Sequence, residues 1–115
     1  MSRFDPLADP DRLRAAFLPL DTVPQAQAWN LDELHELLDP DHPMVDAAVL
    51  VALVPRPEGA TILLTRRTET LNRHAGQVSF PGGRMDMADA SPIHTALRET
   101  WEEVAIRGEL IEPVG

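Results

Sequence analysis

The chain has 115 residues, of which 43% are hydrophobic and 25% are charged, a composition typical of a globular protein with one domain and a modest core. Its net charge of −9 argues against non-specific binding to nucleic acid or to an anionic membrane surface. The absence of cysteine excludes disulfides, thiol catalysis and cysteine zinc sites, and it is compatible with a reducing cytoplasm. We therefore expect a cytoplasmic protein with neither a nucleic-acid nor a membrane partner.

The first 44 residues are interpreted as a helical extension that precedes the domain of residues 45–115. Asp9-Pro10-Asp11 is expected to open a short helix through Phe17, because proline is tolerated in the first turn. Apolar residues recur at helical spacing over 31–38, and Asn30 is a suitable N-cap for that second helix.

The next segment predicts strands instead of helices. Residues 47–54 form a nearly continuous apolar run, which is typical of a buried strand. Residues 61–66 are interpreted as a second strand, and the Pro- and Gly-containing segment 55–59 as the turn between them. The sequence therefore predicts a hairpin over 47–66.

A basic loop is expected over residues 67–76, followed by a short strand over 77–80. Pro81-Gly82-Gly83 is expected to break this strand and to leave the backbone open to close approach by a ligand.

Ser91 and Pro92 predict the start of a helix, with serine as the cap and proline at the first helical position. Gly108 marks its expected end, and Leu110-Ile111 is expected to begin another strand. The spacing predicts an apolar stripe that packs into the core, with Trp101 as a core residue. Its members are Ile93, Leu97, Trp101 and Val104.

Three glutamates of this helix, Glu99, Glu102 and Glu103, share one face because they lie three and four residues apart. Like charges at this spacing cost about 0.2–0.5 kcal/mol per pair, and the chain contains no lysine to offset them. Carboxylate clusters of this kind suit Mg²⁺ or Mn²⁺. A solvated helix face is the alternative reading. Arg98 lies four residues before Glu102, a spacing that permits an ion pair between them.

Gly83, Asp89 and residues 98–106 together resemble the Nudix box, and Arg98-Glu99-x-x-Glu102-Glu103 matches its core fully. The chain departs from that motif at a few positions. Asp89 stands where glutamate is expected, one extra residue precedes Arg98, Thr100 replaces an apolar residue, and Ala105 replaces glycine.

The residues before the box resemble the coenzyme A diphosphatase branch of the Nudix family. The matching segments are Leu63-Leu64-Thr65-x-Arg67, His74, Gly76-Gln77-Val78 and Phe80-Pro81-Gly82-Gly83. The branch also tends to carry the longer spacer and an Asp-x-x-Asp, here Asp86 and Asp89, which we interpret as turn and cap residues in preference to metal ligands. Asn72 stands where the branch has arginine.

This resemblance implies an α/β Nudix fold, in which a mixed β-sheet lies between helices and the box forms a loop–helix–loop. It also implies metal-dependent hydrolysis of coenzyme A to 3′,5′-ADP and 4′-phosphopantetheine. Mg²⁺ or Mn²⁺ would be held by Glu99, Glu103, Glu102 and the Gly83 carbonyl. Catalytic roles fall to Glu102, Glu103 and Arg98, and substrate recognition to Arg67, His74 and Gln77.

Two alternatives stay open at this point, a Nudix hydrolase for another nucleoside diphosphate derivative and a non-catalytic Nudix-like binding module. A Nudix domain normally continues past the box helix, so we expect the fold to be incomplete in this chain. Strands without partners would leave apolar faces open, and we expect the isolated 115-residue chain to be poorly folded.

Overall fold

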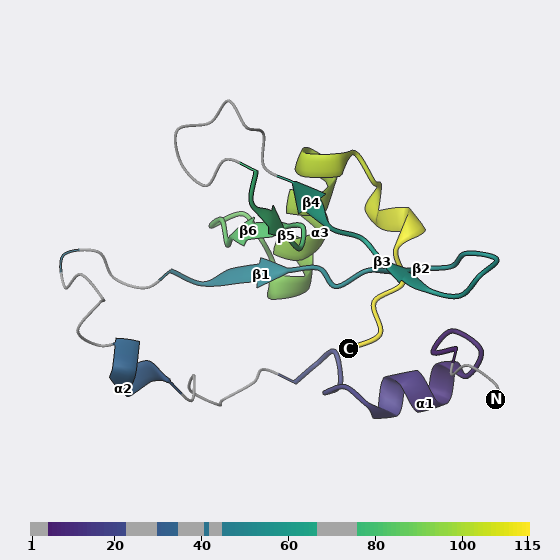
Figure 1. The fold of residues 1–115 in the computed structure, drawn as a ribbon. Coiled ribbons are helices and arrows are strands. Elements are labelled where there is room, and N and C mark those ends of the chain that lie inside the picture. Colours follow the sequence, from purple (N-terminus) through teal and green to yellow (C-terminus); the bar gives the residue numbers. More distant parts are fainter. Residues whose placement is uncertain (1–4, 23–29, 35–40, 42–44, 67–75) are drawn as a thin grey trace.

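The structure, a computed structural model, describes residues 5–22, 30–34, 41, 45–66 and 76–115 (Figure 1). Most of the predicted basic loop, including Arg67 and His74, lies outside these residues, as does the second half of the predicted helix 31–38. Across the described residues, none of the helices combines the length and the apolar character needed to cross a membrane.

The first helix begins where the sequence predicts. Helix α1 spans Pro10–Ala15, and the Asp9 carboxylate caps it by accepting a hydrogen bond from the Arg12 amide at 3.1 Å. Helix α2 spans Leu31–Leu34. An ion pair of 3.0 Å joins Arg14 Nη2 of α1 to Glu112 Oε1, and α1 accordingly lies near the C-terminus in Figure 1.

In the part of the chain that the structure describes, six short strands form three antiparallel pairs, and together with the helices they confirm the α/β class. β1 (Ala47–Val49) pairs with β6 (Gly82–Arg84), β2 (Leu53–Val54) with β3 (Thr61–Ile62), and β4 (Thr65–Arg66) with β5 (Val78–Ser79). Each of the predicted strands 47–54 and 61–66 is therefore divided in two, and the strand pairing in the described residues is antiparallel throughout.

The predicted hairpin exists only around its turn. Leu53 lies opposite Ile62, and Gly59 closes the turn with a positive φ of 124°. Before Leu53 the chain pairs with a different segment. The Leu50 amide donates to Pro81 O at 2.7 Å, just before β6, whereas Ala52 O accepts a hydrogen bond from the Leu63 amide, just after β3. β1 thereby pairs with β6, which lies far along the chain, and not with its hairpin neighbour.

The expectation that Pro81-Gly82-Gly83 breaks a strand is only partly met. The break falls at Phe80 and Pro81, while Gly82 and Gly83 belong to β6. A side-chain carbon on Gly82 would contact the backbone oxygen of Ala48 and would lie 2.6 Å from Val49 Cα. Glycine at this position therefore allows β6 to approach β1 closely.

Helix α3 spans Pro92–Val104, and the Ser91 hydroxyl caps it by accepting a hydrogen bond from the His94 amide at 3.2 Å. The helix ends at Val104 and not at Gly108, because Ala105 adopts a left-handed conformation with φ 57°. Residues Gly108–Leu110 form the 3₁₀ helix η1, so the strand expected at Leu110 is wrong.

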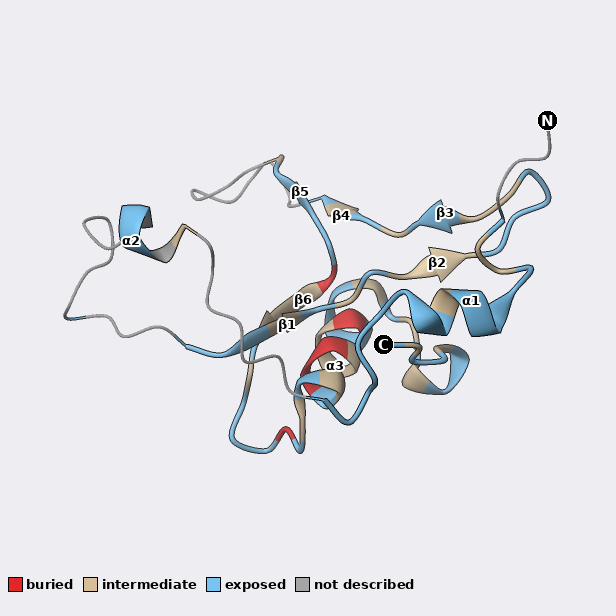
Figure 2. Cartoon of the chain, turned by 90° about the horizontal axis from the view of Figure 1, so that it is seen from below, coloured by how far each residue is buried: buried red, intermediate tan, exposed pale blue. Residues whose placement is uncertain are grey.

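Helix α3 packs against β1 and β6 (Figure 1), but through a different face from the predicted one. Its buried residues are Thr95, Ala96 and Thr100, which appear red in Figure 2. Trp101 is 49% exposed, so its predicted place in the core is wrong. Small side chains on the helix and glycines on the strand allow the two backbones to approach, and the larger apolar stripe is left on another side.

Little apolar surface is buried in the described part of the chain. Its buried residues are Pro81, Asp89, Thr95, Ala96 and Thr100. Several large strand residues are more than half exposed, among them Val49, Ile62 and Val78. The expectation of open apolar faces is therefore confirmed for the described strands.

Candidate functional site

The candidate site lies where β6 meets the middle of α3, and its closest contact joins Gly83 to Glu99. A side-chain carbon on Gly83 would lie 2.6 Å from Glu99 Cδ and 2.7 and 2.8 Å from its two carboxylate oxygens. The Glu99 side chain is only 19% exposed. Glycine at position 83 thus leaves the space that this carboxylate occupies.

Arg98 is the centre of the polar network. Its Nη1 donates to Glu99 Oε1 at 3.1 Å and to both carboxylate oxygens of Glu102 at 3.2 and 3.1 Å. The ion pair predicted from the four-residue spacing of Arg98 and Glu102 is therefore confirmed. One guanidinium nitrogen holds two of the three box glutamates in fixed positions.

Asp89 binds the other edge of the same guanidinium. Arg98 Nε donates to Asp89 Oδ1 at 2.8 Å, and Nη2 donates to Oδ2 at 2.9 Å, a two-pronged geometry that is stronger and more directional than a single bond. The Asp89 side chain is buried, with 1% exposure. Its Oδ2 also accepts from the Asp86 amide and from the Thr95 hydroxyl, each at 2.9 Å.

These contacts shift the pKa values of both partners. The hydrogen bonds from Arg98, followed by the one from the Asp86 amide, hold the pKa of Asp89 well below its usual range and outweigh its burial. The hydrogen bonds that Arg98 donates to Asp89, and then those to Glu102 and Glu99, raise the pKa of the guanidinium. The pair therefore stays fully ionised across the physiological pH range.

Arg98 also joins the helix to the sheet. Its Nη2 donates to the backbone oxygen of Arg84 at 3.1 Å, at the end of β6. The guanidinium thus contacts the loop through Asp89, the strand through Arg84, and α3 through the glutamates. It faces three carboxylates with one positive charge, so the cluster keeps an excess of negative charge.

The donor set fits a hard divalent cation. The Glu99 carboxylate lies beside Gly83, and Glu102 and Glu103 follow it on α3. Oxygen ligands of this kind suit Mg²⁺ or Mn²⁺. Considering the described residues alone, no three His, Cys, Asp or Glu side chains are already arranged around a common metal position. The contacts of Glu99 and Glu102 with Arg98 account for part of this, because both carboxylates are turned toward the guanidinium.

Of the predicted substrate-binding residues, the structure describes only Gln77. Gln77 is exposed and immediately precedes β5. Arg67 and His74 lie outside the described residues.

The structure gives a part in the network to two residues, Asp89 and Thr95, that were not among the predicted site residues. Asp89 was interpreted only as a turn or cap residue. Its carboxylate does accept a hydrogen bond from the Asp86 amide, as that of a turn residue would, but it also binds Arg98. Its place at the glutamate position of the box was a signal for this role. Thr95 supports Asp89, and nothing in the sequence pointed to it.

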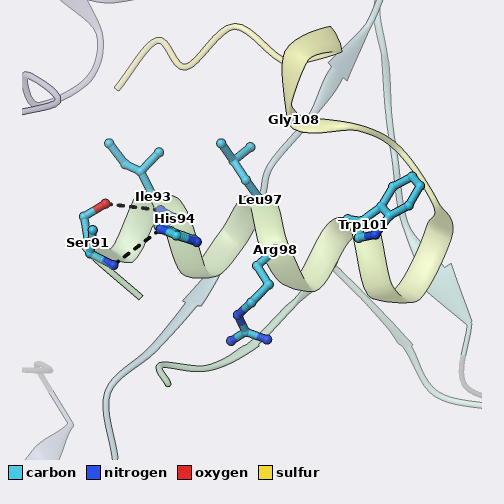
Figure 3. Close-up of a pocket in the computed structure, with 8 residues that line it drawn as sticks. Ser91, Ile93, His94, Leu97, Arg98, Trp101 and Gly108 are labelled. Carbon is cyan, nitrogen blue, oxygen red and sulfur yellow. Dashed lines mark hydrogen bonds between the residues drawn. The ribbon is translucent and has the colours of Figure 1, made fainter. Parts of the chain in front are cut away.

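An open pocket lies along a different side of α3 (Figure 3). Ile93 and Leu97 point to one side of the helix in this view, and Arg98 points to the other. Three residues of the predicted apolar stripe, Ile93, Leu97 and Trp101, line the pocket, and so do Arg98 and Gly108. The carboxylates of Glu99, Glu102 and Glu103 do not line it.

Comparison with known proteins gives consistent matches. A family model described as the NUDIX domain matches residues 44–115. A protein of Yersinia enterocolitica named "Uncharacterized Nudix hydrolase NudL" is 56% identical over 69 residues, which cover 60% of this chain and 35% of that protein. A protein of the same name from Pectobacterium atrosepticum is 51% identical over 83 residues, which cover 72% of this chain and 43% of that protein. The chain thus spans less than half the length of these relatives.

Proposed function

Because this chain belongs to the NUDIX domain family, we propose that it forms part of a metal-dependent hydrolase that cleaves the diphosphate bond of coenzyme A and its derivatives. The products are 3′,5′-ADP and 4′-phosphopantetheine. The observation that carries this proposal is the Arg98 network, in which one guanidinium binds both Glu102 and the Glu99 carboxylate that lies beside Gly83.

Glu99 and Glu103, with Glu102 and the carbonyl of Gly83, would hold Mg²⁺ or Mn²⁺ in this proposal. When bound, such an ion neutralises phosphate charge and lowers the pKa of a coordinated water. Arg98 contributes by orienting the carboxylates, since it contacts Glu99 at 3.1 Å and both oxygens of Glu102.

Glu102 is the proposed acceptor of the proton from the attacking water. Its side chain is 53% exposed, so a water molecule and a substrate phosphate can reach it. The two contacts from Arg98 restrict the orientation of its carboxylate, and a positioned carboxylate is a suitable general base.

Coenzyme A as substrate is supported by the sequence motifs before the box. The relatives are named as Nudix hydrolases, and their names specify no substrate. An acidic chain that binds a substrate with a diphosphate and a 3′-phosphate needs local basic groups. Arg67 and His74, with Gln77, are the proposed contacts, because arginine can bind phosphate with two parallel hydrogen bonds.

The decisive experiment uses the whole natural protein with coenzyme A and 3′-dephospho-coenzyme A in separate reactions, with Mn²⁺ or Mg²⁺ and with a chelator as control. Products are identified by mass. Metal-dependent formation of 3′,5′-ADP and phosphopantetheine, with coenzyme A preferred, is the expected result. Cleavage of other nucleoside diphosphate derivatives alone would move the assignment to another Nudix substrate. Cleavage of none would favour a binding module.

A further inference from the structure

Thr95 is one of the most deeply buried side chains of the described fold, with 0% exposure, and its hydroxyl faces the polar network. Thr95 Oγ1 lies 2.9 Å from Asp89 Oδ2 and 3.3 Å from the backbone oxygen of Ser91. A hydroxyl has one proton to donate, and an ionised carboxylate at the shorter distance is the stronger acceptor. The proton of Thr95 therefore points to Asp89.

The oxygen that Thr95 binds is the one that also accepts from Arg98. Asp89 Oδ2 accepts a hydrogen bond from Arg98 Nη2 at 2.9 Å, and Asp89 Oδ1 accepts one from Arg98 Nε at 2.8 Å. Arg98 in turn holds Glu99 and Glu102 through Nη1. A continuous series of hydrogen bonds thus runs from the buried face of α3 to the carboxylates at its surface.

We propose that Thr95 is a positioning residue, whose hydroxyl fixes the Asp89 carboxylate and, through Arg98, the positions of Glu99 and Glu102 for a divalent cation. The inference rests on the proposed function, because the cation matters only if these glutamates bind it. The hydrogen bonds of the Thr95 hydroxyl go to Asp89 and to the Ser91 backbone, so the hydroxyl acts on the glutamates through Asp89 and Arg98.

Thr100 shows what a buried threonine of the same helix does without this role. It is also 0% exposed, and its hydroxyl donates to the backbone oxygen of Ala96 at 2.7 Å. That bond begins and ends within α3 and does not reach the Arg98 network. Thr100→Val and Thr95→Val remove the same group from the same helix at equal burial, so Thr100→Val is a matched control.

The experiment measures Mn²⁺ binding to the whole natural protein without substrate, from the electron paramagnetic resonance signal of free Mn²⁺. Thermal unfolding is recorded for each variant. Four variants are compared with the parent protein, namely Thr95→Val, Thr95→Ser, Thr95→Ala and Thr100→Val. Serine and alanine at position 95 both lack the methyl group of threonine, so that pair isolates the hydroxyl even if Thr95→Val fails to fold.

The expected result is a rise of about tenfold in the Mn²⁺ dissociation constant for Thr95→Val and Thr95→Ala, the lower end of the usual range for groups that orient metal ligands. The Mn²⁺ dissociation constants of Thr95→Ser and Thr100→Val should stay within about twofold of the parent value, because both variants keep a hydroxyl at position 95 that can bind Asp89. With coenzyme A as substrate, Thr95→Val should lower kcat and leave KM nearly unchanged.

Several outcomes would overturn the inference. Equal Mn²⁺ affinity in Thr95→Ser and Thr95→Ala would show that the hydroxyl is irrelevant. Equal losses of Mn²⁺ affinity in Thr95→Val and Thr100→Val, in proportion to the fall in their thermal midpoints, would show a purely structural effect. If the parent protein did not bind Mn²⁺, there would be no cation site for Thr95 to position. Failure to cleave coenzyme A refutes only the proposed substrate, since the binding measurement contains none.

Discussion

Gly83 of β6 and Glu99 of α3 are so close that a side-chain carbon on the glycine would lie 2.6 Å from the Glu99 carboxyl carbon. The two residues are sixteen positions apart, and they meet because β6 pairs with β1 and α3 packs across both strands. The position of a proposed metal ligand therefore depends on the absence of a side chain on the neighbouring strand.

Gly83→Ala should reduce activity far more than stability. The atoms that an alanine would meet are the far end of the Glu99 side chain, which can rotate away at little cost to the fold. Displacing a ligand by about 1 Å can lower the rate by about a hundredfold. The measurement is kcat and Mn²⁺ affinity, together with thermal unfolding, for the whole natural protein.

Gly82→Ala provides the contrast for that prediction. A side-chain carbon at Gly82 would meet the backbone of Ala48 and Val49, which cannot move without disturbing the β1–β6 pair. This variant should mainly lower the thermal midpoint. If Gly83→Ala lost stability to the same extent as Gly82→Ala, the proposed displacement of Glu99 would not explain its effect.

Asp89→Asn should destabilise the protein at neutral pH and weaken its response to acid. The pKa of Asp89 is lowered in the folded state, so its contribution is complete above its unfolded pKa of about 3.9 and is lost as pH falls below that value. The free energy of unfolding, measured with urea from neutral pH downward, should therefore fall less steeply below about pH 3.9 in the variant. Parallel curves for both proteins would contradict this account.

Glu102→Gln should lower kcat by about a hundredfold or more, because the amide retains the size of the side chain but cannot accept the proton of the attacking water. The test is to measure kcat for coenzyme A in steady-state assays over a range of pH. Near-normal turnover would remove Glu102 from the role of general base. Mn²⁺ affinity, measured in parallel, would show whether the loss arises from metal binding instead.

Arg67→Ala should raise the KM for coenzyme A by about tenfold to a hundredfold, the effect of losing a charge-assisted hydrogen bond to phosphate. Arg66→Ala is the matched control, since it removes the same charge from the adjacent position on β4. The kinetic constants of all three proteins are compared. Unchanged KM and rate in Arg67→Ala would exclude this arginine from substrate recognition.

Ala105→Gly should stabilise the protein by about 1 kcal/mol, because Ala105 has a φ of 57° and a left-handed conformation is unfavourable for residues with a Cβ atom. Glycine relieves that cost at the C-terminal end of α3, and it is the residue that the Nudix motif carries there. Urea unfolding of the two proteins is the measurement. A decrease in stability would show that the greater freedom of glycine in the unfolded chain outweighs the relief.

The sequence by itself determined the features that depend on neighbours within one turn of helix. Ser91 and Pro92 located the start of α3, and the spacing of Arg98 and Glu102 predicted their ion pair. Such contacts follow from the geometry of a single helix, so they need no knowledge of the rest of the fold. The box residues likewise identified the family that the comparisons show.

Only the tertiary structure decided which segments meet. Periodicity identified an apolar stripe that includes Trp101, but packing buried Thr95 and its neighbours, because small side chains on α3 and glycines on β6 let the helix and the strand approach closely. The same packing brought Glu99 to Gly83. Arg98 binds Asp89 only because the loop before α3 folds back on the helix, a long-range geometry that no local spacing specifies.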